Sequence, residues 1–132
     1  MSVLLSIKPK YAHAIMSGKK KYEFRKRIPK NFSKIYLYSS SNVQKIIGYL
    51  EIGKIIEATP QKLWRMYGKL GGIEREDFFT YFEGYNEGYS MEIKKAKKFK
   101  CPIDPYLSYK KFTPPMSYFY ISEEKIAKMK KG

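Results

Sequence analysis

The sequence predicts an α+β fold in which several short, bent strands form a small barrel or a strongly curled sheet. Three observations lead to this prediction: apolar and polar residues alternate in several segments, few segments have helical spacing, and Gly48 and Gly53 interrupt the longest β-prone stretch. Glycines inside a strand often mark the bulges or bends that a small barrel requires. The 132 residues, 43% of them hydrophobic, are expected to form one domain over 1–132.

The first half of the chain is predicted to run strand, helix, strand, strand, strand. A continuous apolar run predicts the first strand over 3–7. Pro9 and Gly18 delimit the helix that follows, because proline suits the first turn and glycine the C-terminal cap. In residues 21–27 apolar and charged side chains alternate, which indicates a strand with one apolar and one charged face. The next β-prone segments are 35–37 and 46–56.

The second half is predicted to insert two helices before the last strands. Thr59 and Pro60 stand in the N-cap and N1 order that opens a helix ending near Gly71, and a second short helix covers 74–82. Strands follow over 89–99 and 117–121, and Pro102 and Pro105 are expected to end the first of these. Residues 122–132 are expected to be a short terminal helix or a frayed tail.

Basic residues are concentrated at the two ends of the chain. The formal net charge is +15; residues 1–50 hold eleven Lys and Arg against one acid, and residues 93–132 hold eleven against three. Residues 51–92 hold five against eight. Lysine can serve simply as soluble surface, but this asymmetry indicates a polyanionic partner, and the thirteen tyrosines offer flat rings for unpaired bases.

Several classes of protein and site are not expected. The chain has no apolar run of about 18 residues that would predict a transmembrane helix, and its start is too short for a secretory signal. One cysteine cannot form an internal disulfide, so we expect a reducing, cytoplasmic environment. His13 and Cys101 lack zinc spacing, and no phosphate-binding glycine loop is present. We therefore expect no metal, no cofactor and no membrane partner.

Glu23 stands out because it is the single acid within a strongly basic segment. A carboxylate weakens polyanion binding, so charge alone does not explain its presence. One interpretation is a salt bridge that orients Arg25 or Lys20. The other is an acid/base group, or an acceptor for a base edge, held among phosphate-binding cations. Glu23 and Arg25 lie two apart on one strand face, about 7 Å along the chain, and Lys20 lies at the turn before it. Both interpretations stay open.

Residues 18–25, Gly-Lys-Lys-Lys-Tyr-Glu-Phe-Arg, fit the pattern Gly-x-Lys-x-x-Glu-x-Arg. This pattern resembles the signature of the ASCH domain, named for homology to the activating signal cointegrator. The segments around it also resemble the opening, middle and closing strands of that family, so the resemblance covers nearly the whole chain. It implies a PUA-like small β-barrel with flanking helices and a cleft between them. That cleft would hold Gly18, Lys20, Glu23 and Arg25.

The resemblance implies a role in RNA recognition. Cleavage of single-stranded RNA and removal of the acetyl group from N4-acetylcytidine are both attributed to the fold. The deacetylating members use a lysine that matches Lys20, a threonine where this chain has Glu23, and a further glutamate. The missing threonine argues against a threonine-centred amidase mechanism in this protein.

Two RNA-directed functions follow as hypotheses. The first is an RNA-binding module for single-stranded RNA or a nucleobase, in which Glu23 accepts from a base amine and tyrosines such as Tyr38, Tyr85 or Tyr89 stack on bases. Its cationic contacts would come from the segment containing Gly18, Lys19, Lys20, Lys21, Arg25 and Arg27. The second is a metal-independent hydrolase of RNA or modified nucleosides, with Lys20, Glu23 and Arg25 as catalytic residues and Glu51 as a candidate second acid.

A third hypothesis is a coactivator-type protein-interaction domain. The acidic, aromatic-rich insert over 60–83 would then be the docking surface for a protein partner. Core packing explains the same aromatic residues more simply.

Overall fold

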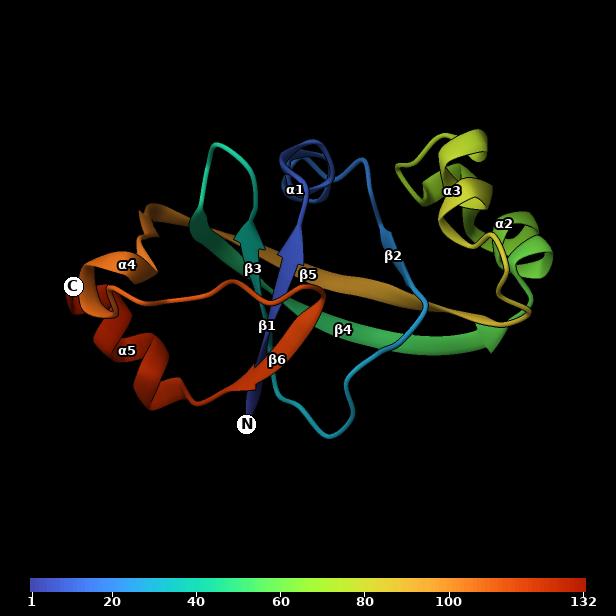
Figure 1. Ribbon diagram of the computed structural model, residues 1–132. Helices are drawn as coiled ribbons and strands as arrows, with labels where there is room; N and C mark the ends of the chain where they lie inside the picture. Colours follow the sequence, from blue (N-terminus) through green and yellow to red (C-terminus); the bar gives the residue numbers. More distant parts are fainter.

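The computed structural model describes all 132 residues as a six-stranded sheet flanked by helices (Figure 1). The strand order is β2-β5-β4-β3-β1-β6, and all neighbours are antiparallel except the parallel pair β1 and β3. The α+β class predicted from the sequence is confirmed. The elements are β1 (Ser2–Ile7), α1 (Pro9–Met16), β2 (Tyr22–Arg25), β3 (Ile35–Ser39), β4 (Lys45–Ala58), α2 (Pro60–Tyr67), the 3₁₀ helix η1 (Gly68–Leu70), α3 (Arg75–Tyr81), β5 (Gly88–Ile103), α4 (Pro105–Ser108), β6 (Tyr118–Ile121) and α5 (Glu123–Lys131).

The long strands β4 and β5, of 14 and 16 residues, form an antiparallel pair that extends across the whole molecule (Figure 1). Their register shifts at three points, and Gly48 and Gly53 lie at two of them. A Cβ atom at Gly48 would overlap the carbonyl oxygen of Lys97 in the facing strand, so only glycine fits there. The prediction that these glycines mark bends is therefore confirmed, and the bends curl the sheet.

The curled sheet is a half-barrel, because its edge strands β2 and β6 do not pair with each other. Side chains bridge the gap instead. The Tyr118 hydroxyl donates to the carbonyl of Ile28 at 3.1 Å, and the Tyr120 hydroxyl donates to the carbonyl of Lys30 at 2.8 Å. The segment after β2 is thus held against β6, and the predicted small barrel is closed by side-chain contacts.

Both faces of the sheet are covered. One face buries Leu5 against Ile15 of α1, and the other buries Leu4 against Ile126 and Met129 of α5. The terminal segment is therefore packed against the sheet, with Ser122 accepting from the backbone N–H of Lys125 as the helix N-cap. No helix is both long and apolar enough to cross a membrane.

The insert of α2, η1 and α3 has a small core of its own next to β2. Phe24 of β2 meets Phe78 of α3 edge-on at 4.9 Å, and Leu63 and Phe82 are buried in the same cluster. Trp64 packs on Phe78 at 5.1 Å between ring centroids. Most aromatic side chains of the insert thus serve packing, and they fix the insert beside β2.

The prediction that Pro102 ends a strand is wrong, because β5 continues to Ile103. Lys98 faces Gly48 and Ile103 faces Ile46, so several residues of β5 bulge between these two pairs. A proline in such a bulge breaks no ladder hydrogen bond that the sheet needs. Pro105 instead opens the short helix α4, with Asp104 as N-cap.

Candidate functional site: a cleft with a buried ion triad

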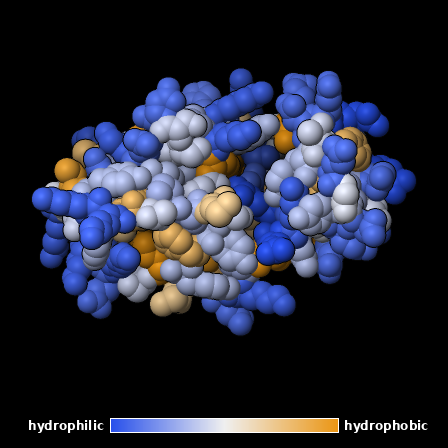
Figure 2. Space-filling model, viewed as in Figure 1, coloured by the Kyte–Doolittle hydropathy of each residue, from blue (hydrophilic) through white to orange (hydrophobic).

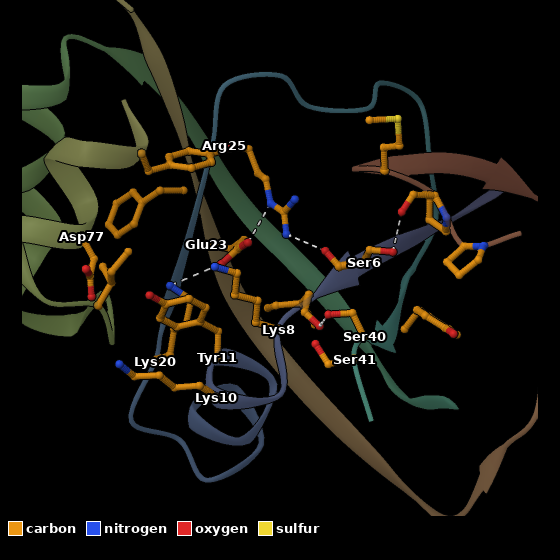
Figure 3. Close-up of a pocket in the computed structure, with 18 of the residues that line it drawn as sticks. Ser6, Lys8, Lys10, Tyr11, Lys20, Glu23, Arg25, Ser40, Ser41 and Asp77 are labelled. Atoms are coloured by element: carbon orange, nitrogen blue, oxygen red, sulfur yellow. Dashed lines mark hydrogen bonds and ion pairs between the residues drawn. The ribbon is translucent and has the colours of Figure 1, made fainter. Parts of the chain in front are cut away.

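A cleft with a volume of about 780 Å³ lies between the helical insert and the body of the molecule. Figure 2 shows the hollow from outside, and Figure 3 shows its interior. One wall comes from α3, the opposite wall from α1 and the residue before it, and β2 contributes the floor. The loop after β3 and the segment 114–116 complete the rim.

The floor holds three charged side chains in direct contact. Glu23 lies between the two cations (Figure 3), with Oε1 at 3.3 Å from Lys20 Nζ and Oε2 at 2.7 Å from Arg25 Nε. Alternation in β2 points Glu23 and Arg25 to the same side, and the turn at Gly18, with φ of +84°, leads Lys20 back to them. We call Lys20, Glu23 and Arg25 the ion triad.

The ion triad is almost closed to solvent. The side chains of Lys20 and Glu23 are 2% and 8% exposed, and that of Arg25 is 12% exposed. Burial alone would raise the pKa of Glu23, but the positive charges of Arg25 and Lys20 and their hydrogen bonds outweigh it and hold that pKa below its ordinary value. Glu23 is therefore a buried, ionised carboxylate.

Lys20 is enclosed by a two-glycine turn that follows η1. Its Nζ donates to the carbonyl of Gly71 at 2.5 Å, and a Cβ atom at Gly72 would stand 2.5 Å from the Cβ of Lys20. Gly72 has φ of +59°, a conformation that favours glycine. Burial lowers the pKa of Lys20, and the charge of Glu23 offsets only part of this effect.

Arg25 reaches beyond the triad toward β1 and β6. Its Nη2 donates to the carbonyl of Ser6 at 3.0 Å, and its Nη1 lies 3.4 Å from the hydroxyl of Ser117. The Ser6 hydroxyl in turn donates to the carbonyl of Pro115 at 2.7 Å. One guanidinium therefore links the floor of the cleft to its rim and spans the two open edges of the half-barrel.

The two walls of the cleft differ in charge. Lys8 and Lys10, both exposed, lie on the α1 side, and the exposed carboxylate of Asp77 lies on the α3 side. Between them, half-buried Tyr11 of α1 and Tyr81 of α3 line the space. The Nζ of Lys20 lies 5.5 Å from the ring centroid of Tyr11, so this aromatic ring adjoins the ion triad.

The structure brings only part of the predicted site together. Lys20, Glu23, Arg25 and Tyr38 line the cleft, although Tyr38 is 1% exposed. Glu51 lies away from the cleft on β4, 3.8 Å from Lys95. The remaining residues named from the sequence do not line the cleft and lie on the surrounding surface: Gly18, Lys19, Lys21, Arg27, Tyr85 and Tyr89.

Sequence reasoning missed the residues that form the walls, namely Lys8, Lys10, Tyr11, Asp77 and Tyr81. Along the chain, each of them belongs to an ordinary local pattern: an apolar helix face, the acids of a first helical turn, or a single surface lysine. Only the folded insert, which sets α3 opposite α1, gives these residues a common site.

The comparisons with known proteins identify the family of this chain. The sequence model of the protein family described as the ASCH domain matches residues 5–103 of this chain. The chain belongs to the ASCH domain family. A relative described as an ASCH domain-containing ribonuclease, from Zymomonas mobilis, is 28% identical over 130 residues, which cover 96% of this chain and 88% of the relative.

Solved structures agree with this assignment. The crystal structure of ASCH from Zymomonas mobilis has a TM-score of 0.88 and 28% identity, covering 97% of this chain and 92% of that one.

The large ribosomal subunit protein uL22 of Ureaplasma parvum is 26% identical over 105 residues, or 78% of this chain, and the match spans 34% of that protein. The predicted ASCH resemblance is confirmed, and with it the curled half-barrel sheet with flanking helices.

Proposed function

We propose that this ASCH domain binds single-stranded RNA and takes one unpaired nucleotide into the cleft. The observation that carries the proposal is the ion triad at the floor of a cleft with tyrosines in its walls. A volume of about 780 Å³ lies within the range of small-ligand sites. RNA-binding proteins commonly hold splayed bases by stacking them on aromatic rings and pairing their phosphates with cations.

The charges of the walls favour one orientation of the nucleotide. Phosphates belong on the α1 side, beside Lys8 and Lys10, because Asp77 repels them from the α3 side. The base then lies toward α3, between Tyr11 and Tyr81, where the Asp77 carboxylate is free to accept from an exocyclic amine. Asp77 thus takes the acceptor role that the sequence pattern suggested for Glu23.

Glu23 acts in this proposal as a positioning residue. Both of its oxygens accept from a cation, and its pKa lies below the ordinary value, so it is a weak base. It holds Lys20 and Arg25 at the floor with their charges facing the cleft. Arg25, with five N–H groups of which Glu23, Ser6 and Ser117 take three, is the residue best placed to contact a phosphate or a carbonyl.

RNA hydrolysis is the second candidate function. The observation that favours it is Lys20, a buried amine with a lowered pKa, next to an arginine at the floor of the cleft. Both cations would stabilise the negative charge that develops on a phosphate under attack. The ribonuclease description of the Zymomonas mobilis relative adds weight to this candidate. Metal-independent removal of an acetyl group from N4-acetylcytidine is the other hydrolysis to be tested.

One set of measurements tests binding and both hydrolytic reactions. Fluorescence anisotropy with labelled single-stranded and duplex RNA gives the affinity, and the same samples, with N4-acetylcytidine added in parallel, are analysed for cleavage and deacetylation. The variants are Tyr11→Leu, Arg25→Gln and Lys62→Gln, the last being an exposed lysine of α2 outside the cleft.

We expect single-stranded RNA to bind better than duplex, and Tyr11→Leu to weaken binding by about tenfold through lost stacking. Arg25→Gln should abolish any cleavage, and Lys62→Gln should match the wild type. RNA binding that does not weaken between about 50 and 200 mM salt would overturn the proposal, because phosphate contacts release counterions.

A further inference from the structure

The basic segment near the C-terminal end of β5 has no part in the cleft. Lysines occupy positions 94, 95, 97, 98 and 100, all of them exposed, and none lines the cleft. The charge asymmetry of the sequence is therefore only partly explained by the ion triad and the α1 wall.

An aromatic cluster lies on the face of the sheet that α5 covers. Tyr49 of β4 and Phe99 of β5 are half-buried, with ring centroids 6.1 Å apart, and both approach the buried Tyr36 of β3, at 6.0 and 6.3 Å. These rings pack beside the core that contains Ile126 and Met129. Tyr49 and Phe99 thus stay partly exposed as residues.

Lysines from separate elements lie over these rings. The Nζ of Lys34, before β3, is 4.6 Å from the ring centroid of Tyr49. The Nζ of Lys130, in α5, is 5.1 Å from that of Phe99. A third pair, Lys125 over Tyr109 at 4.8 Å, extends the same pattern along α5. Such pairs are held by attraction between the cation and the ring face.

The strand register adds a further lysine to this face. Lys97 is the cross-strand partner of Tyr49, and partners in an antiparallel pair project from the same side of the sheet. Lys95 is likewise opposite Glu51, at 3.8 Å from its carboxylate. The other acid of this face, Glu123, accepts from the hydroxyls of Ser2 and Tyr36. We call Tyr49, Phe99, Lys34, Lys97 and Lys130 the basic aromatic face.

We propose that the basic aromatic face is a second binding surface for single-stranded RNA, separate from the cleft. Bases would stack on the accessible parts of Tyr49 and Phe99, and the flexible lysines would move from the rings to the adjacent phosphates. The charge complementarity and the alternation of rings with cations favour this partner. The inference rests on the proposed RNA binding, to which it adds a second contact for strands longer than a few nucleotides.

The test compares RNA lengths and two charge-matched double variants. Lys97→Gln with Lys130→Gln removes two cations from the basic aromatic face. Lys62→Gln with Arg65→Gln removes two exposed cations from α2, at the opposite end of the molecule (Figure 1). The affinity of each protein for a single-stranded trinucleotide and for a 20-mer is measured over a series of salt concentrations. A Tyr49→Leu variant keeps apolar packing and removes the stacking ring.

We expect the Lys97 and Lys130 variant to bind the 20-mer about tenfold more weakly than the α2 control does. The slope of log affinity against log salt is negative, and its magnitude should fall by about 1.4, since each single-strand phosphate contact contributes about 0.7. Trinucleotide binding should stay at the wild-type level. Tyr49→Leu should also weaken only the 20-mer.

The outcomes separate this inference from the proposed function. If the wild type binds neither RNA, both proposals fail. If the wild type binds both and the Lys97 and Lys130 variant behaves as the α2 control, only the second surface is overturned, and the lysines serve as soluble cover for the rings. Equal losses for trinucleotide and 20-mer would also overturn it, because the substitutions would then act on the cleft.

Discussion

The carboxylate of Glu23 has no free oxygen, since Lys20 binds one and Arg25 the other. The contact to Arg25 could be predicted from residues two apart on one strand, and the contact to Lys20 from the turn at Gly18. The carbonyl of Gly71, 51 residues from Lys20 in sequence, could not, because no local pattern connects the insert to β2. Because Glu23 is buried and both of its oxygens are paired, we assign it the positioning role in the proposed function.

Glu23→Gln should lower the free energy of unfolding by about 3–5 kcal/mol. The amide keeps the shape of the side chain but leaves two cations buried without their counter-charge, and breaking a buried ion pair has this magnitude. Urea denaturation measures the change. The matched control is Glu51→Gln, whose contact with Lys95 is exposed and should contribute only about 0–1 kcal/mol. Equal effects of the two substitutions would contradict the buried, ionised state of Glu23.

The pH dependence of stability gives a second test of Glu23. Its pKa in the folded protein lies below the ordinary value, which is about 4.3 in an unfolded chain. The lower folded-state pKa means that the stabilisation is complete above about pH 5 and is lost as the pH falls through 4.3 toward the folded-state pKa. The stability difference between wild type and Glu23→Gln should therefore narrow on acidification to about pH 3. If the difference in unfolding free energy between wild type and Glu23→Gln stayed constant over that pH range, Glu23 would not have a lowered pKa in the folded protein.

Among the elements, those defined by alternation or by strong caps could be predicted, and those defined by distant contacts could not. The alternating residues of β2 and the Thr59-Pro60 start of α2 are where the sequence indicates. The run of β5 through Pro102 depends on a register shift against β4 that a single strand does not reveal. The role of the turn at Gly71 and Gly72 also depends on a distant contact. In the sequence this turn has the pattern of a helix end, and in the fold it encloses Lys20.

Gly72→Ala should destabilise the protein more than Gly84→Ala does. Both glycines have positive φ, +59° and +82°, so both substitutions carry similar backbone strain. A new Cβ at Gly84 meets nothing within 4 Å, whereas one at Gly72 stands 2.5 Å from Lys20. The difference between their urea-denaturation free energies isolates the contact with Lys20, and we expect about 1–3 kcal/mol, typical of overpacking. Indistinguishable variants would show that the turn does not hold Lys20.

In the whole molecule, opposite charges are sorted onto different surfaces. The sequence indicates this sorting as two basic ends around an acidic middle, but only the fold assigns places to the charges. Lys8 and Lys10 lie on the α1 wall, and Asp77 lies on the α3 wall. Lys97 and Lys130 belong to the basic aromatic face. At the floor of the cleft, Arg25 links β2 to the end of β1 and to the residue before β6. In the proposed function, this arrangement would give a bound strand a defined direction.

The two walls of the cleft should accordingly have separable effects on RNA binding. Lys8→Gln with Lys10→Gln should weaken trinucleotide binding and keep the preference among bases. The magnitude of the slope of log affinity against log salt should fall by about 1.4, because two phosphate contacts are lost. Asp77→Ala should leave the slope unchanged and lower the preference for cytosine and adenine, which carry an exocyclic amine, over uracil. The salt slope and the base preference are both measured from the affinities for the homotrinucleotides of cytosine, adenine and uracil over a series of salt concentrations. The double variant Lys62→Gln with Arg65→Gln is the charge-matched control. If the lysine variant changed base preference, or Asp77→Ala changed the slope, the assignment of phosphate to the α1 wall and base to the α3 wall would be wrong.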